Sequence, residues 1–247
     1  MVQRFWQKTV LLSSLALATG LMGSVVSAAP AQATSTTRSI PAFGFGCVSN
    51  NNASNCEAGS NQFQVKLTEH SPTQVMFKFF NIGPAASSIT RIYFEDTGFK
   101  TLGSVAQIVN SAGVNFSTNY PGNANMPAGN TIDFKTTSSV GATSPVQPKG
   151  VNNDPDITDS SPSEFVGIVF NVLPGFNDSF NAVVTDLQRG TLRVGLHAQG
   201  FSNGGSESFV NGAVPEPITT VGSGIALGFG ALLNQKRKAA KRKAAKA

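Results

Sequence analysis

Stretches in which every second residue is apolar recur along the middle of the 247-residue chain, and they leave few folds open. The clearest are Gln62–Glu69 and Gln74–Phe80. Because successive side chains of a strand point to opposite faces, each stretch would place three apolar side chains on one face of a sheet. These residues are Phe63, Val65 and Leu67 in the first stretch and Val75, Phe77 and Phe79 in the second. The pattern predicts an all-β domain.

Further strands are predicted where apolar or alternating residues are bounded by turn residues. They are Ser88–Glu95, Phe165–Val172, Thr191–Phe201 and an edge strand at Ser206–Val210, with less regular candidates at Val105–Val109, Val114–Ser117 and Thr131–Lys135. The intervals 119–130 and 136–163 are rich in Asn, Ser, Pro and Gly and are predicted as surface loops. Roughly seven to nine strands in about 180 residues indicate a β-sandwich.

One short helix is predicted within this domain, at Asp178–Gln188. Apolar residues recur there at helical spacing, Asn177 or Asp178 can cap the first turn, and Gly190 can end the helix. The apolar residues are Phe180, Val183, Val184 and Leu187. The expected fold is therefore a β-sandwich-like domain with one helix.

Residues 1–33 have the three parts of a secretory signal peptide. A basic start and an apolar stretch are followed by a small-x-small site for signal peptidase. These parts are Arg4 with Lys8, Val10–Val26, and Ala31 with Ala33. Polar residues and glycines interrupt the apolar stretch, which favours cleavage after Ala33 over the alternative of an uncleaved anchor helix.

Residues 213–247 carry a second localisation signal. The segment Ile218–Leu233 is uncharged and, with sixteen residues, slightly shorter than the roughly 17–25 that a transmembrane helix needs. The Lys/Arg-rich tail that follows should stay on the cytoplasmic side. The chain is therefore expected to span the membrane during export, with its β-domain outside the cytoplasm.

The net charge of +5 does not indicate a nucleic-acid partner once the charges are located. Between residues 34 and 213 lie nine of the 18 Lys/Arg and twelve of the 13 Asp/Glu, so this span has a net charge of −3. The excess of basic residues belongs to the signal peptide and the tail. The domain lacks a Lys/Arg cluster that could neutralise phosphates, and no nucleic-acid partner is expected.

Cys47 and Cys56 are the only cysteines of the chain. In an oxidising compartment an even number of cysteines favours a disulfide, which would stabilise the fold by roughly 2–3 kcal/mol for so short a loop. The alternative is a metal pair, but no histidine lies near either cysteine in the sequence, and two ligands leave a metal site incomplete. The sequence thus favours a disulfide.

No residue pattern typical of an enzyme is present. The two histidines, His70 and His197, are 127 residues apart, and the chain has neither a G-x-S-x-G nor an H-E-x-x-H motif. His70 is expected as a turn residue at a strand end, and His197 on the face opposite the core. A calcium site is a hypothesis for one acidic loop, because carboxylate oxygens are ligands that calcium prefers. Its residues would be Asp154, Asp156 and Asp159.

The three-part tail resembles the PEP-CTERM sorting signal of bacterial exported proteins. Val214-Pro215-Glu216-Pro217 precedes a short Gly-rich span and a basic end. The resemblance implies processing by an exosortase, a membrane-embedded transpeptidase-like enzyme, with Pro215, Glu216 and Pro217 as the motif. The two prolines also keep this segment extended and outside the helix, as a processing site requires.

The domain is also similar to a recurring type of PEP-CTERM ectodomain. The stretches that match are 88–96, 192–199 and 204–211. This resemblance implies a shared fold. The PEP-CTERM class is linked to the cell envelope and to exopolysaccharide or biofilm matrix.

The sequence therefore predicts a signal peptide at 1–33, a β-sandwich-like ectodomain at 34–212 and a sorting signal at 213–247. The favoured function is a non-enzymatic protein of the cell surface or matrix, anchored transiently in the membrane through its C-terminus. The alternative is a carbohydrate- or calcium-dependent module that binds exopolysaccharide through the 136–163 loop. An extracellular hydrolase has no motif to support it, and no cofactor is expected.

Overall fold

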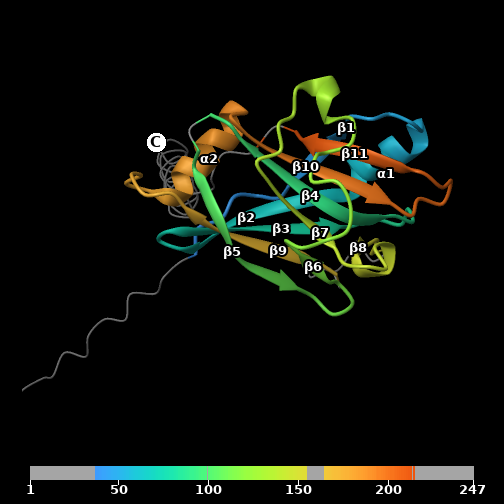
Figure 1. Cartoon of the computed structure of the whole chain (residues 1–247), viewed down its shortest axis with the longest axis horizontal. Helices are drawn as coiled ribbons and strands as arrows, with labels where there is room; N and C mark the ends of the chain where they lie inside the picture. The colour runs from blue at the N-terminus through green and yellow to red at the C-terminus, as the bar shows by residue number, and fades with distance from the viewer. Residues whose placement is uncertain (1–36, 99, 155–163, 213, 215–247) are drawn as a thin grey trace, which may run out of the picture. The chain divides into compact units, whose positions relative to one another are not determined.

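The computed structural model describes residues 37–98, 100–154, 164–212 and 214. This part of the chain contains eleven strands, two α-helices and two short 3-10 helices (Figure 1). The strands are β1 (Phe43–Cys47), β2 (Phe63–Ser71), β3 (Gln74–Asn81), β4 (Ser88–Asp96), β5 (Leu102–Asn110), β6 (Phe116–Ser117), β7 (Ser138–Ala142), β8 (Val151–Asn152), β9 (Val166–Val172), β10 (Leu192–Gln199) and β11 (Ser206–Asn211). The helices are α1 (Ala53–Gln62), α2 (Ser179–Arg189), η1 (Gly129–Ile132) and η2 (Gln147–Lys149).

The strands form one continuous sheet in the order β5-β9-β3-β2-β1-β11-β10-β4-β7-β6, with β8 paired to β4. Strand β1 is the link between the two halves of this sheet, because Phe43 pairs with Val65 of β2 and Phe45 pairs with Asn211 of β11. The all-β prediction is confirmed. In place of the two separate sheets expected of a sandwich, the described strands make a single antiparallel sheet that curls on itself (Figure 1).

The predicted apolar alternation forms the inner face of this sheet. All six residues that it placed inward in β2 and β3 are fully buried. Curling brings Phe94 of β4 against rings of β3 and β9, with ring centroids 5.2 Å from Phe77 and 4.7 Å from Phe170. Such edge-to-face contacts add to the stabilisation that burial provides. The core is therefore a phenylalanine cluster shared by the two halves of the sheet.

A side chain bridges the two edge strands, β5 and β6. The Asn110 amide donates to the backbone oxygen of Phe116 (3.2 Å) and accepts from its backbone nitrogen (2.9 Å). The amide thus takes the place of one pair of backbone hydrogen bonds between the two strands and covers part of each sheet edge. The sheet is nearly closed and barrel-like.

Helix α2 confirms the predicted helix. The Asp178 carboxylate caps its first turn by accepting from the Asn181 backbone nitrogen, and Gly190, with φ 71°, ends the helix in the left-handed region. The four apolar residues predicted for the buried face are all buried. The Arg38 guanidinium donates to the carboxylates of both Asp178 and Glu69, which ties the start of the domain to α2 and β2.

Helix α1 is absent from the sequence prediction, which places a single helix in the domain. Its residues are mostly polar and show no apolar periodicity. The Asn52 side chain caps it by accepting from the backbone nitrogens of Ser54 and Asn55. Gly59 lets the helix lie directly on the core, because a Cβ there would come within 2.2 Å of the Phe209 ring.

The prediction of a strand at Thr131–Lys135 is wrong. Helix η1 ends within this stretch, and Asp133 follows it with φ 50°, outside the strand region. Ile132 and Phe134 alternate as in a strand, but both pack on Tyr93 from a segment that does not pair with the sheet. The alternation of Ile132 and Phe134 is therefore explained by their burial against the outer face of the sheet.

Other differences concern the predicted loops and the strand order. The interval 136–163, predicted as one long loop, contains β7, β8 and η2, and β1 has no counterpart in the prediction. Only Phe116–Ser117 of the candidate Val114–Ser117 is a strand. Strand β11, expected at an edge, lies between β1 and β10. The formation of these strands depends on hydrogen bonding to neighbouring strands more than on alternating apolar residues in their own sequences.

The predicted signal helix and the predicted transmembrane helix at 218–233 lie outside the described residues, as do the domain boundaries at 33 and 213. Among the residues that the structure describes, no helix combines the length and the apolar character needed to cross a membrane.

Replacing Phe94 by alanine should destabilise the domain by about 3–5 kcal/mol, because the change removes a fully buried ring that contacts both halves of the sheet. Leu173→Ala is the control, since Leu173 is 38% exposed and its loss should cost less than about 1 kcal/mol. Urea unfolding followed by circular dichroism measures both. A similar small cost for the two variants would contradict a core shared by both halves.

Candidate functional site

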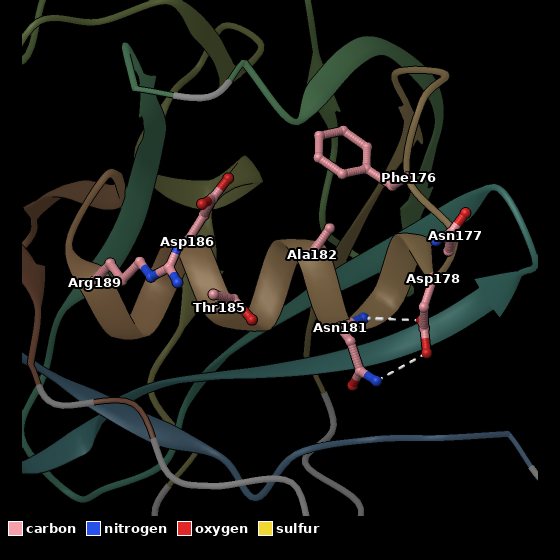
Figure 2. A pocket seen from close by; sticks show the side chains of 8 residues that line it. All are labelled: Phe176, Asn177, Asp178, Asn181, Ala182, Thr185, Asp186 and Arg189. Carbon is pink, nitrogen blue, oxygen red and sulfur yellow. Dashed lines mark hydrogen bonds between the residues drawn. The ribbon is translucent and has the colours of Figure 1, made fainter.

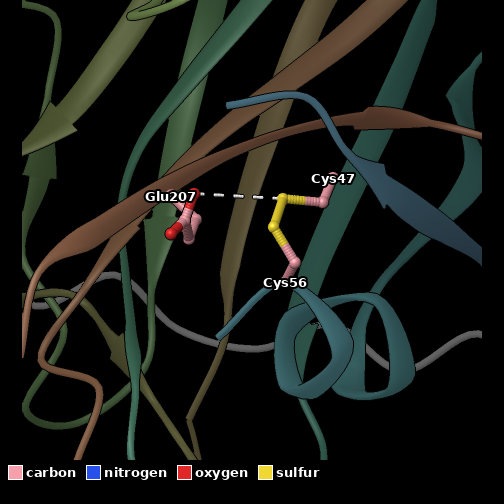
Figure 3. A group of neighbouring side chains, drawn as sticks. All are labelled: Cys47, Cys56 and Glu207. Atoms are coloured by element: carbon pink, nitrogen blue, oxygen red, sulfur yellow. Dashed lines mark hydrogen bonds between the residues drawn. A yellow bond between two sulfur atoms is a disulfide. The ribbon is translucent and has the colours of Figure 1, made fainter. Parts of the chain in front are cut away.

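The two cysteines meet where β1 ends and α1 begins (Figure 3). A disulfide joins them, with Cα atoms 5.3 Å apart. The predicted pairing is therefore present. Asn52 caps the start of α1, and Cys56 lies in the first turn of this helix. Cys56 is buried and Cys47 is half-buried.

The Glu207 side chain of β11 lies beside this disulfide and is only 1% exposed. Its carboxylate accepts from the backbone nitrogens of Asn51 (3.0 Å) and Asn52 (2.7 Å) and from the Ser49 hydroxyl. Charge-assisted bonds of this kind can satisfy a buried carboxylate without a cation. Glu207 thus holds the turn between β1 and α1 in place.

Cys47, Cys56 and Glu207 each offer one metal-ligand atom, and these atoms lie within 4.8 Å of one another. Within the described residues, this is the only such group of three His, Cys, Asp or Glu side chains. The dashed line in Figure 3 joins Glu207 Oε2 to Cys47 Sγ at 4.0 Å. Because a disulfide sulfur carries no proton, this approach is a contact and not a hydrogen bond.

A second cluster lies on the outer face of the sheet, opposite the phenylalanine core. In the strand register, His197 of β10 pairs with Arg91 of β4 on one side and with Ser208 of β11 on the other. Its neighbours Leu196 and Ala198 belong to the core, so the prediction that His197 faces away from the core is confirmed. His197 is nevertheless buried, with 6% of its surface exposed.

Residues 118–136, which we call the covering segment, cross part of this outer face. Met126 and Phe134 of this segment pack on the buried ring of Tyr93 in β4. Gly195 of β10 makes this approach possible, because a Cβ there would lie 2.4 Å from the Met126 sulfur. The covering segment therefore excludes water from the Tyr93 ring.

Four buried polar atoms on the outer face have no hydrogen-bond partner among the described residues. They are Arg91 Nε, Tyr93 OH, His197 Nδ1 and Ser208 Oγ. Arg91 still donates through Nη2 to the backbone oxygen of Pro121 in the covering segment, at 3.0 Å. Because buried polar groups are nearly always paired, four such atoms on adjacent strands are unusual.

Burial also controls how two of these groups titrate. Loss of hydration raises the pKa of the Tyr93 hydroxyl to about 12. Burial, followed by the positive charge of Arg91, lowers the pKa of His197 to about 4, with Glu207 acting in the opposite direction. His197 is therefore neutral at pH 7. Since Ser208 Oγ has no partner in the described part of the chain, it forms no nucleophile–base pair with His197.

Of the three residues predicted as calcium ligands, only Asp154 lies within the described residues. Asp154 is held through its backbone, whose nitrogen donates to the oxygen of Asn81 and whose oxygen accepts from the nitrogen of Gly83, both at 2.9 Å. His70 is exposed and is the penultimate residue of β2, so it lies near a strand end as predicted but within the strand and not in the turn. The predicted positions outside the described residues are Asp156 and Asp159 of the calcium loop, Ala31 and Ala33 of the cleavage site, and Pro215, Glu216 and Pro217 of the sorting motif.

A groove of about 290 Å³ runs along one face of α2 (Figure 2). It is lined by Phe176, Asn177, Asp178, Asn181, Ala182, Thr185, Asp186 and Arg189. Asp178 already bonds to Arg38 and Asn181, and the Asp186 carboxylate accepts from the hydroxyls of Thr101 and Thr191. The groove therefore presents amides, a hydroxyl and an aromatic ring to a ligand more readily than it presents carboxylates.

Sequence reasoning missed both Glu207 and the outer-face cluster. Glu207 is a single acidic residue in a strand of serine and apolar residues, and its partners lie in a turn that is distant in sequence. Period two predicts the face on which His197 lies. It does not predict the neighbours Arg91 and Ser208, because these depend on the strand order.

Acid should destabilise the domain through His197. Its pKa in the folded protein, about 4, is below the ordinary 6.5, so this contribution is complete above pH 6.5 and is lost as the pH falls toward 4. The loss should reach about 3 kcal/mol. His197→Gln should remove this part of the pH dependence, and His70→Gln, at an exposed site, should retain it.

Urea unfolding at a series of pH values measures the effect in the three proteins. The carboxyls of Glu69 and Asp178, whose pKa values are lowered by Arg38, also weaken the fold in acid, but equally in all three. Identical pH dependence in wild type and His197→Gln would contradict the role of His197.

Comparison with known protein families, curated proteins and solved structures gave no match to this chain.

Proposed function

We propose that the chain is an exported, non-enzymatic protein of the cell surface or extracellular matrix, with a structural or binding role. The observation that carries this proposal is the Cys47–Cys56 disulfide, because such bonds form and persist in oxidising compartments. The signal-peptide pattern of residues 1–33 supports the same destination. No hydrogen bond joins His197 to Ser208, which supports a role without nucleophilic catalysis.

The proposed route uses both ends of the chain. Signal peptidase removes the N-terminal segment, and the uncharged span 218–233 holds the chain in the membrane until an exosortase-type enzyme acts at Pro215, Glu216 and Pro217. The three-part pattern of 213–247 supports this route. A span at the short end of the transmembrane range suits a temporary anchor.

A second candidate function, carbohydrate binding, is favoured by the groove on α2. Its amides, Asn177 and Asn181, can both donate to and accept from sugar hydroxyls, and the half-buried Phe176 ring offers an apolar surface to a sugar face. The contact proposed here lies on α2, whereas the sequence alone suggested the 136–163 loop. An exopolysaccharide would be the corresponding partner at the cell surface.

Mass spectrometry of the protein isolated from its native host tests the route. The expected mature form begins at Thr34 and ends near Pro215–Pro217, without the apolar span and the basic tail. A cell fraction that retains the full chain to Ala247 would instead indicate a permanent membrane anchor. Persistence of residues 1–33 would contradict export by signal peptidase.

Glycan-array binding tests the second candidate. Asn181→Ala should weaken binding to a recognised glycan about tenfold, because one lost pair of hydrogen bonds corresponds to about 1.4 kcal/mol. Asn119→Ala, an exposed amide on the covering segment, is the matched control and should bind as wild type does. Absence of any bound glycan, or equal binding by both variants, would contradict a sugar site on α2.

A further inference from the structure

The corner formed by Cys47, Cys56 and Glu207 holds the ligand set of a metal site. The three side chains come from β1, α1 and β11, and their ligand atoms lie within 4.8 Å of one another. The sequence had offered only the two cysteines, which leave a site incomplete, and the fold adds a carboxylate as the third ligand. Two thiolates and one carboxylate suit Zn²⁺, which commonly takes sulfur and oxygen ligands with a water in the fourth position.

The third ligand is positioned without help from the disulfide. Glu207 is held by the backbone nitrogens of Asn51 and Asn52 and by the hydroxyl of Ser49. Hydrogen bonds of this outer shell fix the orientation of a ligating carboxylate and strengthen metal binding. Oε2 of this carboxylate accepts from Ser49 and Asn51 and Oε1 accepts from Asn52, so of about four acceptor positions the one left for an ion is on Oε1.

Only the sulfur–sulfur bond prevents these atoms from acting together as ligands. Thiolates bind metals, whereas sulfurs joined in a disulfide carry no such charge. The Cα atoms of Cys47 and Cys56 are 5.3 Å apart, and side-chain rotation after reduction can separate the sulfurs enough to share one ion. Cys47, which is half-buried, gives a small reductant access to the bond.

We propose that reduction of the Cys47–Cys56 disulfide converts this corner into a Zn²⁺ site whose ligands are the two thiolates and the Glu207 carboxylate. A phosphine supplies the two electrons that break the sulfur–sulfur bond and is itself oxidised, and water supplies both the oxygen of the phosphine oxide and the two thiol protons. Binding of the ion then releases both thiol protons to the solvent. This inference does not rest on the proposed export, although an exported chain would pass through the reduced state before it leaves a reducing cytoplasm.

The test uses the purified full chain, freed of metal and reduced with a water-soluble phosphine. The phosphine supplies the two electrons and becomes a phosphine oxide with an oxygen atom from water, so the reductant adds no thiol. Zinc binding is measured by competition with a chromogenic chelator, before and after reduction. The reduced chain should bind one Zn²⁺ at a site that the oxidised chain lacks, and Cys47→Ser should remove it.

Glu207→Gln identifies the third ligand, with Glu57→Gln as the matched control on the exposed side of α1, next to Cys56. Zinc affinity of the reduced protein should fall at least about tenfold in Glu207→Gln and stay unchanged in Glu57→Gln. Circular dichroism of each oxidised variant checks that the domain is folded. If Glu207→Gln does not fold, a cobalt-substituted wild type answers the question, since its absorption distinguishes two thiolates plus oxygen ligands from other sets.

Equal zinc binding by the oxidised and reduced chains would overturn the proposal, as would a reduced chain that binds no zinc. Equal affinities of Glu207→Gln and wild type would overturn the role of the carboxylate. None of these results depends on where the native protein is delivered, so failure here and failure of the export route can be told apart.

Discussion

Burial of phenylalanine rings between the two halves of one sheet is the constraint on which the rest of the structure depends. An antiparallel sheet with an apolar face must cover that face, and this chain does so by curling the sheet on itself. Phe94 from one half meets Phe77 and Phe170 from the other. The link through β1 and the bridge at Asn110 follow from this curl, because a flat sheet would leave both its inner face and its edges open.

The outer face is covered differently, and this explains its unusual polar groups. The covering segment packs on Tyr93 there and bonds to the side chains of Arg91, Glu95 and Arg193. It leaves the Tyr93 hydroxyl and His197 Nδ1 without a partner among the described residues. Desolvation then acts on groups such as His197 without a matching partner. The inner face is mainly apolar, and its buried Asn81 is hydrogen-bonded to Gln62 and Ser87, whereas the outer face carries polar atoms without partners among the described residues. The outer side of the sheet is therefore one source of acid sensitivity, through His197, beside the carboxylates of Glu69 and Asp178.

The sequence alone predicts the elements whose signals are local. Period two in β2 and β3, the cap at Asp178 and the left-handed Gly190 are all read from neighbouring residues, and the structure confirms them. Helix α1 and strand β1 could not be predicted in this way. The residues of α1 are polar, and the features that mark it in the structure are the cap at Asn52 and the close packing at Gly59. The cysteine pair could be predicted because no other cysteines compete. Glu207 could not, since only the strand order brings β11 next to β1.

The corner formed by Cys47, Cys56 and Glu207 is likewise held by long-range contacts as well as by the disulfide. A disulfide closing so short a loop stabilises the fold by roughly 2–3 kcal/mol, which is modest beside the burial of a phenylalanine core. Glu207 holds the turn from 49 to 52 by hydrogen bonds that do not involve sulfur. The pairing of β1 with β2 and β11 is made by backbone hydrogen bonds, which also do not involve sulfur. Reduction should therefore leave the backbone of this corner in place, so the redox state changes the chemistry available there more than it changes the fold.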